Sequence, residues 1–140
     1  MSAGRGITHS EFNSSSSEGV HFLQIWIMPD HTGITPGYEQ KRIDLSAARG
    51  RLHLIAADQG GPGAVSLHQD VSVSVAILES GEQFVHRLGD GKYAWLQLVR
   101  GSADVNGNTL NAGDGAAISS ESEVSVGTSG QAEMLLFDIA

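Results

Sequence analysis

Residues 71–78, VSVSVAIL, alternate apolar and small polar side chains, and this alternation constrains the fold more than any other feature of the chain. Alternate residues of a β-strand point to opposite faces, so the pattern predicts a strand with Val71, Val73 and Val75 on one face. Further strand candidates recur at intervals of about 8–12 residues, which favours a sandwich or a jelly roll. No segment shows sustained helical periodicity, although residues 34–50 have room for a short helix.

The other strand candidates are apolar segments bounded by turn residues. They are RLHLIAA at 51–57, ESGEQFVHRL at 79–88, YAWLQLVRG at 93–101, GAAI at 115–118 and AEMLLFDI at 132–139. Asn106-Gly107 predicts a tight hairpin, because both residue types tolerate a positive φ. Residues 21–28, HFLQIWIM, are apolar on both alternating faces. We therefore expect a strand there that is covered on both sides and ends at Pro29.

Charge and composition exclude several classes of function. The chain has 140 residues, the length of one domain, with 16 acidic residues against 8 basic ones. A net charge of −8 repels phosphate backbones, so we expect no nucleic-acid partner. The absence of cysteine excludes disulfides and zinc–thiolate sites. No apolar run is long enough to cross a bilayer and no secretory leader is visible, so we expect a cytoplasmic protein without a membrane partner.

His9 and Glu11 are the first candidates for a functional site. On a strand, residues two apart share a face, so the imidazole and the carboxylate would project side by side. One nitrogen and one oxygen donor are how a site for a first-row metal begins, but two ligands do not complete it. A solvated pair at a loop edge is the alternative explanation.

Three segments together resemble a known family. Gly6, His9 and Asn13 reproduce the GxxHxxxN core of the second cupin motif, and QIWIMP at 24–29 and GITPGYEQ at 33–40 accompany it. This combination resembles the pirin family, bicupins that include bacterial quercetin 2,3-dioxygenases. The likeness extends over essentially all 140 residues. It implies an all-β cupin jelly-roll barrel, the C-terminal cupin of a bicupin, with leftover strands of an incomplete first barrel.

The resemblance also implies a metal site. The family's N-terminal barrel holds one metal, usually iron, with three histidines and one glutamate; His9 and Glu11 match one histidine and the glutamate. The family's upstream HxH pair has no counterpart, because none of the six histidines lies two residues from another. We therefore expect the missing ligands to lie before Met1. On this interpretation, residues 1–45 are a remnant of the N-terminal cupin barrel with its connection, and residues 46–140 are the C-terminal cupin domain.

The implied activity is the ring opening of a flavonol with O2, with iron or another divalent first-row metal as cofactor. Glu11 would be the catalytic base for the substrate hydroxyl as well as a ligand. We expect this chain alone to bind metal poorly and to lack dioxygenase activity. Two alternatives stay open: a non-enzymatic pirin-like regulatory or scaffold cupin that binds another protein, and a decayed gene product.

Other histidines give weaker signals. His21 is a candidate replacement for the third ligand, although a hydrogen-bonded histidine at a strand end is the favoured interpretation. His68 and His86 fall where a second cupin places ligands, but neither has a suitably spaced partner, so we expect no metal in the second barrel. Without strands from a first barrel, residues 21–28 would expose apolar surface. We expect them to pack back on the second barrel or to pair with a second copy in a homodimer.

Overall fold

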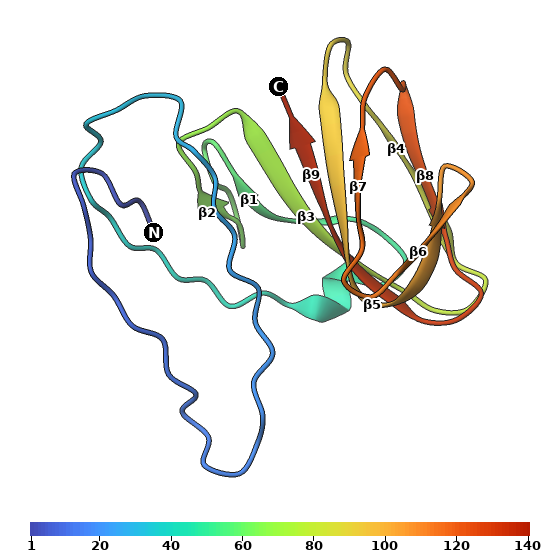
Figure 1. The fold of residues 1–140 in the computed structure, drawn as a ribbon, viewed down its shortest axis with the longest axis horizontal. Coiled ribbons are helices and arrows are strands. Elements are labelled where there is room, and N and C mark those ends of the chain that lie inside the picture. Colours follow the sequence, from blue (N-terminus) through green and yellow to red (C-terminus); the bar gives the residue numbers. More distant parts are fainter.

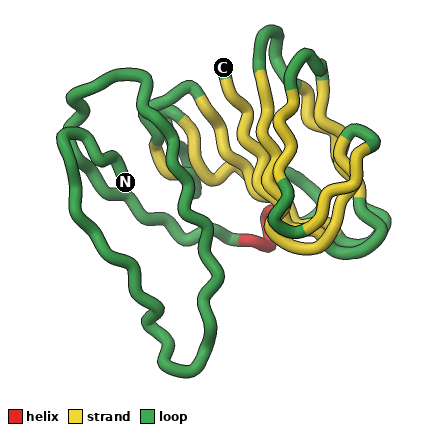
Figure 2. Tube along the Cα trace, in the orientation of Figure 1, coloured by secondary structure: helices red, strands yellow, loops and turns green.

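The computed structural model describes residues 1–140, and its regular structure is almost entirely β (Figure 1). One 3-10 helix, η1 (Leu45–Ala48), precedes nine strands. These are β1 (His53–Ala57), β2 (Val65–Ser66), β3 (Val71–Leu78), β4 (Gln83–Arg87), β5 (Tyr93–Val105), β6 (Asn108–Asn111), β7 (Gly115–Ile118), β8 (Glu123–Gly127) and β9 (Ala132–Ile139). Residues 1–44 form no helix or strand and run as a long loop beside the sheet (Figure 2). No helix has the length and apolarity needed to cross a bilayer.

The strands form a curled sheet in the order β2-β1-β3-β9-β5-β8-β4, with β6 and β7 also paired to β5. Every pairing is antiparallel except that of β1 with β2. The last strand, β9, pairs along its whole length with β3 on one side and with β5 on the other. The all-β prediction is confirmed.

Strand β5 belongs to both layers of the curled sheet. Its first half pairs with β9 and β7, and its end pairs with β6 and β8. The strand changes layer just past a register shift between Leu98 and Arg100, at Gly101, which has a φ of +77°. Only glycine adopts this conformation without strain, so Gly101 forms the corner at which the sheet curls over.

The core lies between the two layers and is wholly apolar. Its fully buried side chains are Leu78, Leu96, Leu98, Val124, Val126, Met134 and Leu136, and no buried residue is polar or charged. A second apolar surface covers the outer face of β3 and β9, where Val75 and Leu135 pack against Ala48 of η1. Strand β3 therefore has apolar side chains on both faces. Its valines lie on the outer face, while Ala76 and Leu78 belong to the core.

The predicted strands other than residues 21–28 are present, and β2 and β8 are additional. The expected hairpin joins β5 to β6, with Asn106 at φ +48° and Gly107 at φ +81°. The room for a helix within residues 34–50 is used by η1. The expected strand at residues 21–28 is wrong, because this segment has no backbone partner in the chain. Of its side chains, Ile27 packs against the outer-face cluster of Ala56, Val71 and Val73.

The loop of residues 1–44 is attached to the sheet through Glu39 and Lys41. The Glu39 carboxylate accepts a hydrogen bond of 2.7 Å from the Ser66 amide and lies 2.9 Å from the Lys41 ammonium. The Lys41 ammonium also donates to the carbonyl of Gly61. The Ser66 amide, and then Lys41, hold the pKa of Glu39 below its ordinary value, because both stabilise the charged carboxylate.

This contact predicts a local pH dependence. A carboxylate with a lowered folded-state pKa contributes stability above its ordinary pKa and loses it as the pH falls through the folded-state value. The Ser66 amide proton shift, followed by NMR, is therefore expected to stay constant at neutral pH and to titrate with a midpoint below that of a free glutamate. Glu39→Gln should abolish the titration, and Glu18→Gln, distant in the loop, should leave it unchanged. A Ser66 titration that persists in Glu39→Gln would contradict the assignment.

Candidate functional site

The two predicted metal ligands lie together in the N-terminal loop. The Nε2 atom of His9 is 3.8 Å from the Oε1 atom of Glu11, and their side chains are 39% and 53% exposed. No strand positions them, since residues 1–44 are outside the sheet. The residues are nevertheless side by side, as their spacing of two predicts for extended backbone.

A hydrogen-bonded turn follows the pair. The Asn13 side chain accepts from the Ser15 amide at 3.0 Å and donates to the Glu18 carbonyl at 2.7 Å. The Ser15 hydroxyl in turn accepts from the Glu18 amide at 2.9 Å. Asparagine and serine favour such local bonds to the backbone, so the polar stretch after the pair reverses the chain toward residues 21–28. The asparagine of the GxxHxxxN pattern thus has a structural role in shaping this turn.

A metal needs more donors than this pair provides. No cluster of three or more His, Cys, Asp or Glu residues in the chain is arranged to hold a metal ion. His21 does not complete the site, because its Nδ1 atom lies 3.2 Å from the Arg100 guanidinium. His9 and Glu11 have the donor chemistry of a first-row metal site, but alone they are too few to fix a coordination geometry. The residues present fit half of such a site.

The remaining histidines have other neighbours. His31 contacts Asp30, and its ring lies edge-on to His68, with 6.1 Å between the ring centroids. His86 of β4 and Asp138 of β9 meet across the barrel, with Nε2 and Oδ2 2.9 Å apart. Both are partly buried, at 28% and 20% side-chain exposure. The sequence indicated His86 as a candidate but gave no sign of Asp138, because 52 residues separate them.

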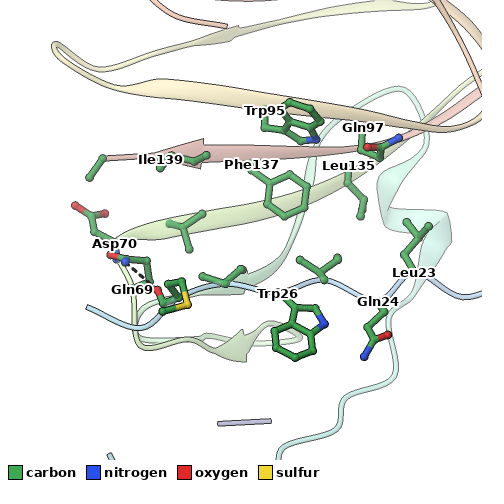
Figure 3. A pocket seen from close by; sticks show the side chains of 15 residues that line it. Leu23, Gln24, Trp26, Gln69, Asp70, Trp95, Gln97, Leu135, Phe137 and Ile139 are labelled. Atoms are coloured by element: carbon green, nitrogen blue, oxygen red, sulfur yellow. Dashed lines mark hydrogen bonds between the residues drawn. The ribbon is translucent and has the colours of Figure 1, made fainter. Parts of the chain in front are cut away.

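A groove of about 660 Å³ lies where residues 23–28 cross the outer face of the sheet (Figure 3). From β5 and β9 it is lined by Trp95, Leu135 and Phe137. Figure 3 shows Phe137 pointing toward the crossing segment, while Trp26 points to the opposite side. The sequence did not indicate this groove, because the groove forms only where segments distant in sequence lie together.

Comparison with known proteins gives the family. The model of the quercetinase C-terminal cupin domain matches residues 54–139, and that of pirin matches residues 1–27. The chain belongs to the pirin family. Its identification from the cupin motif of His9 and its neighbours is confirmed.

Curated pirin relatives align with the whole of this chain. A quercetin 2,3-dioxygenase of Escherichia coli K12 is 42% identical over 139 residues, which are 99% of this chain and 59% of the relative. A pirin-like protein of Caulobacter vibrioides is 33% identical over 141 residues, covering 100% of this chain and 60% of the relative. This pirin chain therefore spans about three-fifths of the length of these relatives.

Solved pirin structures confirm the cupin jelly roll. The crystal structure of YhhW from Escherichia coli superposes with a TM-score of 0.77 and 36% identity, covering 82% of this chain and 48% of YhhW. A complex of the same bacterial pirin with nickel(II) gives a TM-score of 0.75 and 35% identity, over 81% and 48% of the two chains. The expected all-β cupin fold is thus present in this pirin chain.

Proposed function

We propose that this chain contributes His9 and Glu11 as two ligands of a metal ion in a flavonol dioxygenase. The metal would be iron or another divalent first-row metal. The observation that carries the proposal is the 3.8 Å approach of imidazole nitrogen and carboxylate oxygen within a pirin sequence match. The quercetin 2,3-dioxygenase name of the relatives and the nickel(II) complex of YhhW support it. The remaining ligands would come from residues outside these 140.

The proposed arrangement divides the chain into a region that serves the metal and a supporting barrel. Residues 1–45 would be the part of the first cupin that carries the ligands, and residues 46–140 the C-terminal cupin. Glu11 would be the catalytic residue, because its half-exposed carboxylate is free to accept a proton from a flavonol hydroxyl. No step through the metal follows from two ligands alone, so this chain by itself is expected to lack dioxygenase activity.

Metal affinity tests the proposed ligands without relying on activity. Two donors predict weak Ni²⁺ binding by this chain, with a dissociation constant on the order of 0.1–1 mM by isothermal titration calorimetry. His9→Ala and Glu11→Ala should each weaken it at least about tenfold, because either change leaves one donor. His21→Ala is the matched control and should leave the affinity unchanged, since His21 lies beside Arg100.

Two outcomes would contradict the assignment. Submicromolar binding by this chain would mean that the site is complete here, and unchanged affinity in His9→Ala would mean that the metal binds elsewhere. Flavonol-dependent oxygen uptake should be absent for this chain. It should appear in a chain extended to the length of the relatives, provided that His9 and Glu11 are intact.

A non-enzymatic, protein-binding role is the second candidate function. The observation that favours it is the apolar groove on the outer face of the sheet, since large exposed apolar patches mark interaction sites. Oxygen uptake by the extended chain discriminates between the two candidates. Uptake lost in Glu11→Gln supports the enzyme, and the absence of uptake from a metal-loaded extended chain supports the binding role.

A further inference from the structure

The turn between β5 and β6 carries Asn106-Gly107, the dipeptide of this chain that is most prone to deamidation. An asparagine before glycine loses its side-chain amide group readily, because glycine has no side chain to hinder attack by its own backbone nitrogen. The chain contains four asparagines, and only Asn106 precedes a glycine. Both residues of the turn are exposed, so burial does not protect them from water.

The Asn106 side chain is held against β8 by both of its polar atoms. Its Oδ1 atom accepts from the Ser125 amide at 2.7 Å, and its Nδ2 atom donates to the Glu123 carbonyl at 3.1 Å. The Asn106 amide also donates to the Ser125 carbonyl at 3.0 Å. The backbone register of β5 with β8 ends one pair earlier, at Val105 and Val126. Asn106 therefore satisfies an edge of β8 that β5 no longer covers, while β4 pairs with the opposite edge.

The backbone nitrogen that would attack the Asn106 side chain is also engaged. The Gly107 amide donates to the Oδ1 atom of Asp104 at 2.8 Å. Deamidation requires the Asn106 carboxamide to leave β8 and to turn toward the Gly107 nitrogen. Both groups must first give up the hydrogen bonds that hold them apart, so the reaction depends on a local opening of the turn.

We propose that Asn106 is a latent deamidation site, which the closed turn protects and which reacts irreversibly when the turn separates from β8. The Gly107 nitrogen loses its proton and bonds to Cγ of Asn106, the Cγ–Nδ2 bond breaks, and Nδ2 leaves with that proton as ammonia. Water then opens the resulting cyclic imide at one of its two carbonyl groups. The product is aspartate or isoaspartate at position 106, and no atom is oxidised or reduced.

Either product prevents the turn from closing as before. An ionised carboxylate only accepts hydrogen bonds, so it cannot replace the bond that Nδ2 of Asn106 donates to the Glu123 carbonyl. It places a negative charge beside that carbonyl oxygen instead. Isoaspartate also inserts a methylene group into the main chain and so alters the tight turn itself. The modification therefore records an opening of the turn in the covalent structure.

Peptide mapping by mass spectrometry tests the protection. The full 140-residue chain is incubated at mildly alkaline pH, with and without urea, and the conversion of each asparagine is followed. In urea, Asn106 should react fastest of the four. In the folded chain its rate should be at least about tenfold lower, because reaction waits for the turn to open.

Two variants test which contacts give the protection. Asp104→Ala removes the acceptor of the Gly107 amide and should raise the folded-state rate at Asn106 several-fold. Asp114→Ala is the matched control, because it removes a carboxylate that accepts from the Asn111 amide at 2.8 Å in the turn after β6. Its rate at Asn106 should equal that of the wild type. Equal rates in the folded and unfolded chains, or a wild-type rate in Asp104→Ala, would overturn the proposal.

Hydrogen exchange tests the effect of the product. Asn106→Asp should raise the exchange rate of the Ser125 amide at least about tenfold, because the new carboxylate disrupts the contact with β8. Asn111→Asp adds the same charge in the same hairpin, at a side chain that makes no hydrogen bond, and should leave that exchange unchanged. Unchanged Ser125 exchange in Asn106→Asp would show that the product still closes the turn, which contradicts the proposal.

Discussion

Replacing Leu96 with alanine is expected to destabilise the chain by about 2–5 kcal/mol, a large part of the stability of a domain of this size. Leu96 is fully buried on the inner face of β5 and belongs to the main core cluster. Its neighbour across the sheet, Leu136 of β9, is also buried. Because the surrounding strands are fixed by hydrogen bonds, they cannot collapse into the space that the missing atoms leave.

Urea unfolding followed by circular dichroism measures this effect. Leu54→Ala is the matched control, since Leu54 lies on β1 with 39% of its surface exposed. It removes the same atoms and should cost well under half as much, because little apolar surface is uncovered. Equal losses in the two variants would show that the β5 interior is not the centre of the core.

Gly101→Ala is expected to destabilise the chain by about 3 kcal/mol or more, from a contact and a backbone conformation that both exclude a side chain. A Cβ atom at this position would lie 1.8 Å from the Gln131 carbonyl oxygen, which is itself backbone and cannot rotate away. The φ of +77° adds strain for any residue with a side chain. The corner of β5 would have to move away from the start of β9.

Gly91 separates the two causes. It has nearly the same φ, +75°, but a Cβ atom there would meet nothing within 4 Å. Gly91→Ala should therefore report the conformational cost alone, about 1 kcal/mol. The difference between the two variants in the free energy of unfolding measures the clash with Gln131. If both variants lose the same amount, the close approach at the β5 corner is absent in solution.

Local patterns predicted most of the barrel, because each strand shows its own apolar alternation and each tight turn its own residues. Val71, Val73 and Val75 indicated β3, and Asn106-Gly107 indicated the hairpin after β5. The pattern of β8 was hidden in a stretch rich in serine and glutamate. Pattern alone wrongly predicted a strand at residues 21–28, since an apolar segment becomes a strand only when another strand supplies its hydrogen bonds.

The candidate site was predicted only where its residues are close together in the sequence. His9 and Glu11 are two residues apart, so their proximity could be inferred from spacing alone. The pairing of His86 with Asp138 and the groove beneath Trp95 depend on how distant strands curl together. No local pattern carries that information, because side-chain periodicity describes which face a residue occupies and not what lies opposite.

The position of β9 has a consequence for how the protein is made. The last strand of the sequence lies between β3 and β5 in the middle of the sheet, and it pairs Val71 with Ile139. Until these residues have been synthesised, the apolar strands β3 and β5 lack the strand that pairs with both of them. Folding of the barrel must therefore wait until β9 has been synthesised, and such distant pairings make it slow. A premature stop codon ahead of Ala132 would leave the facing edges of β3 and β5 unpaired and exposed to aggregation.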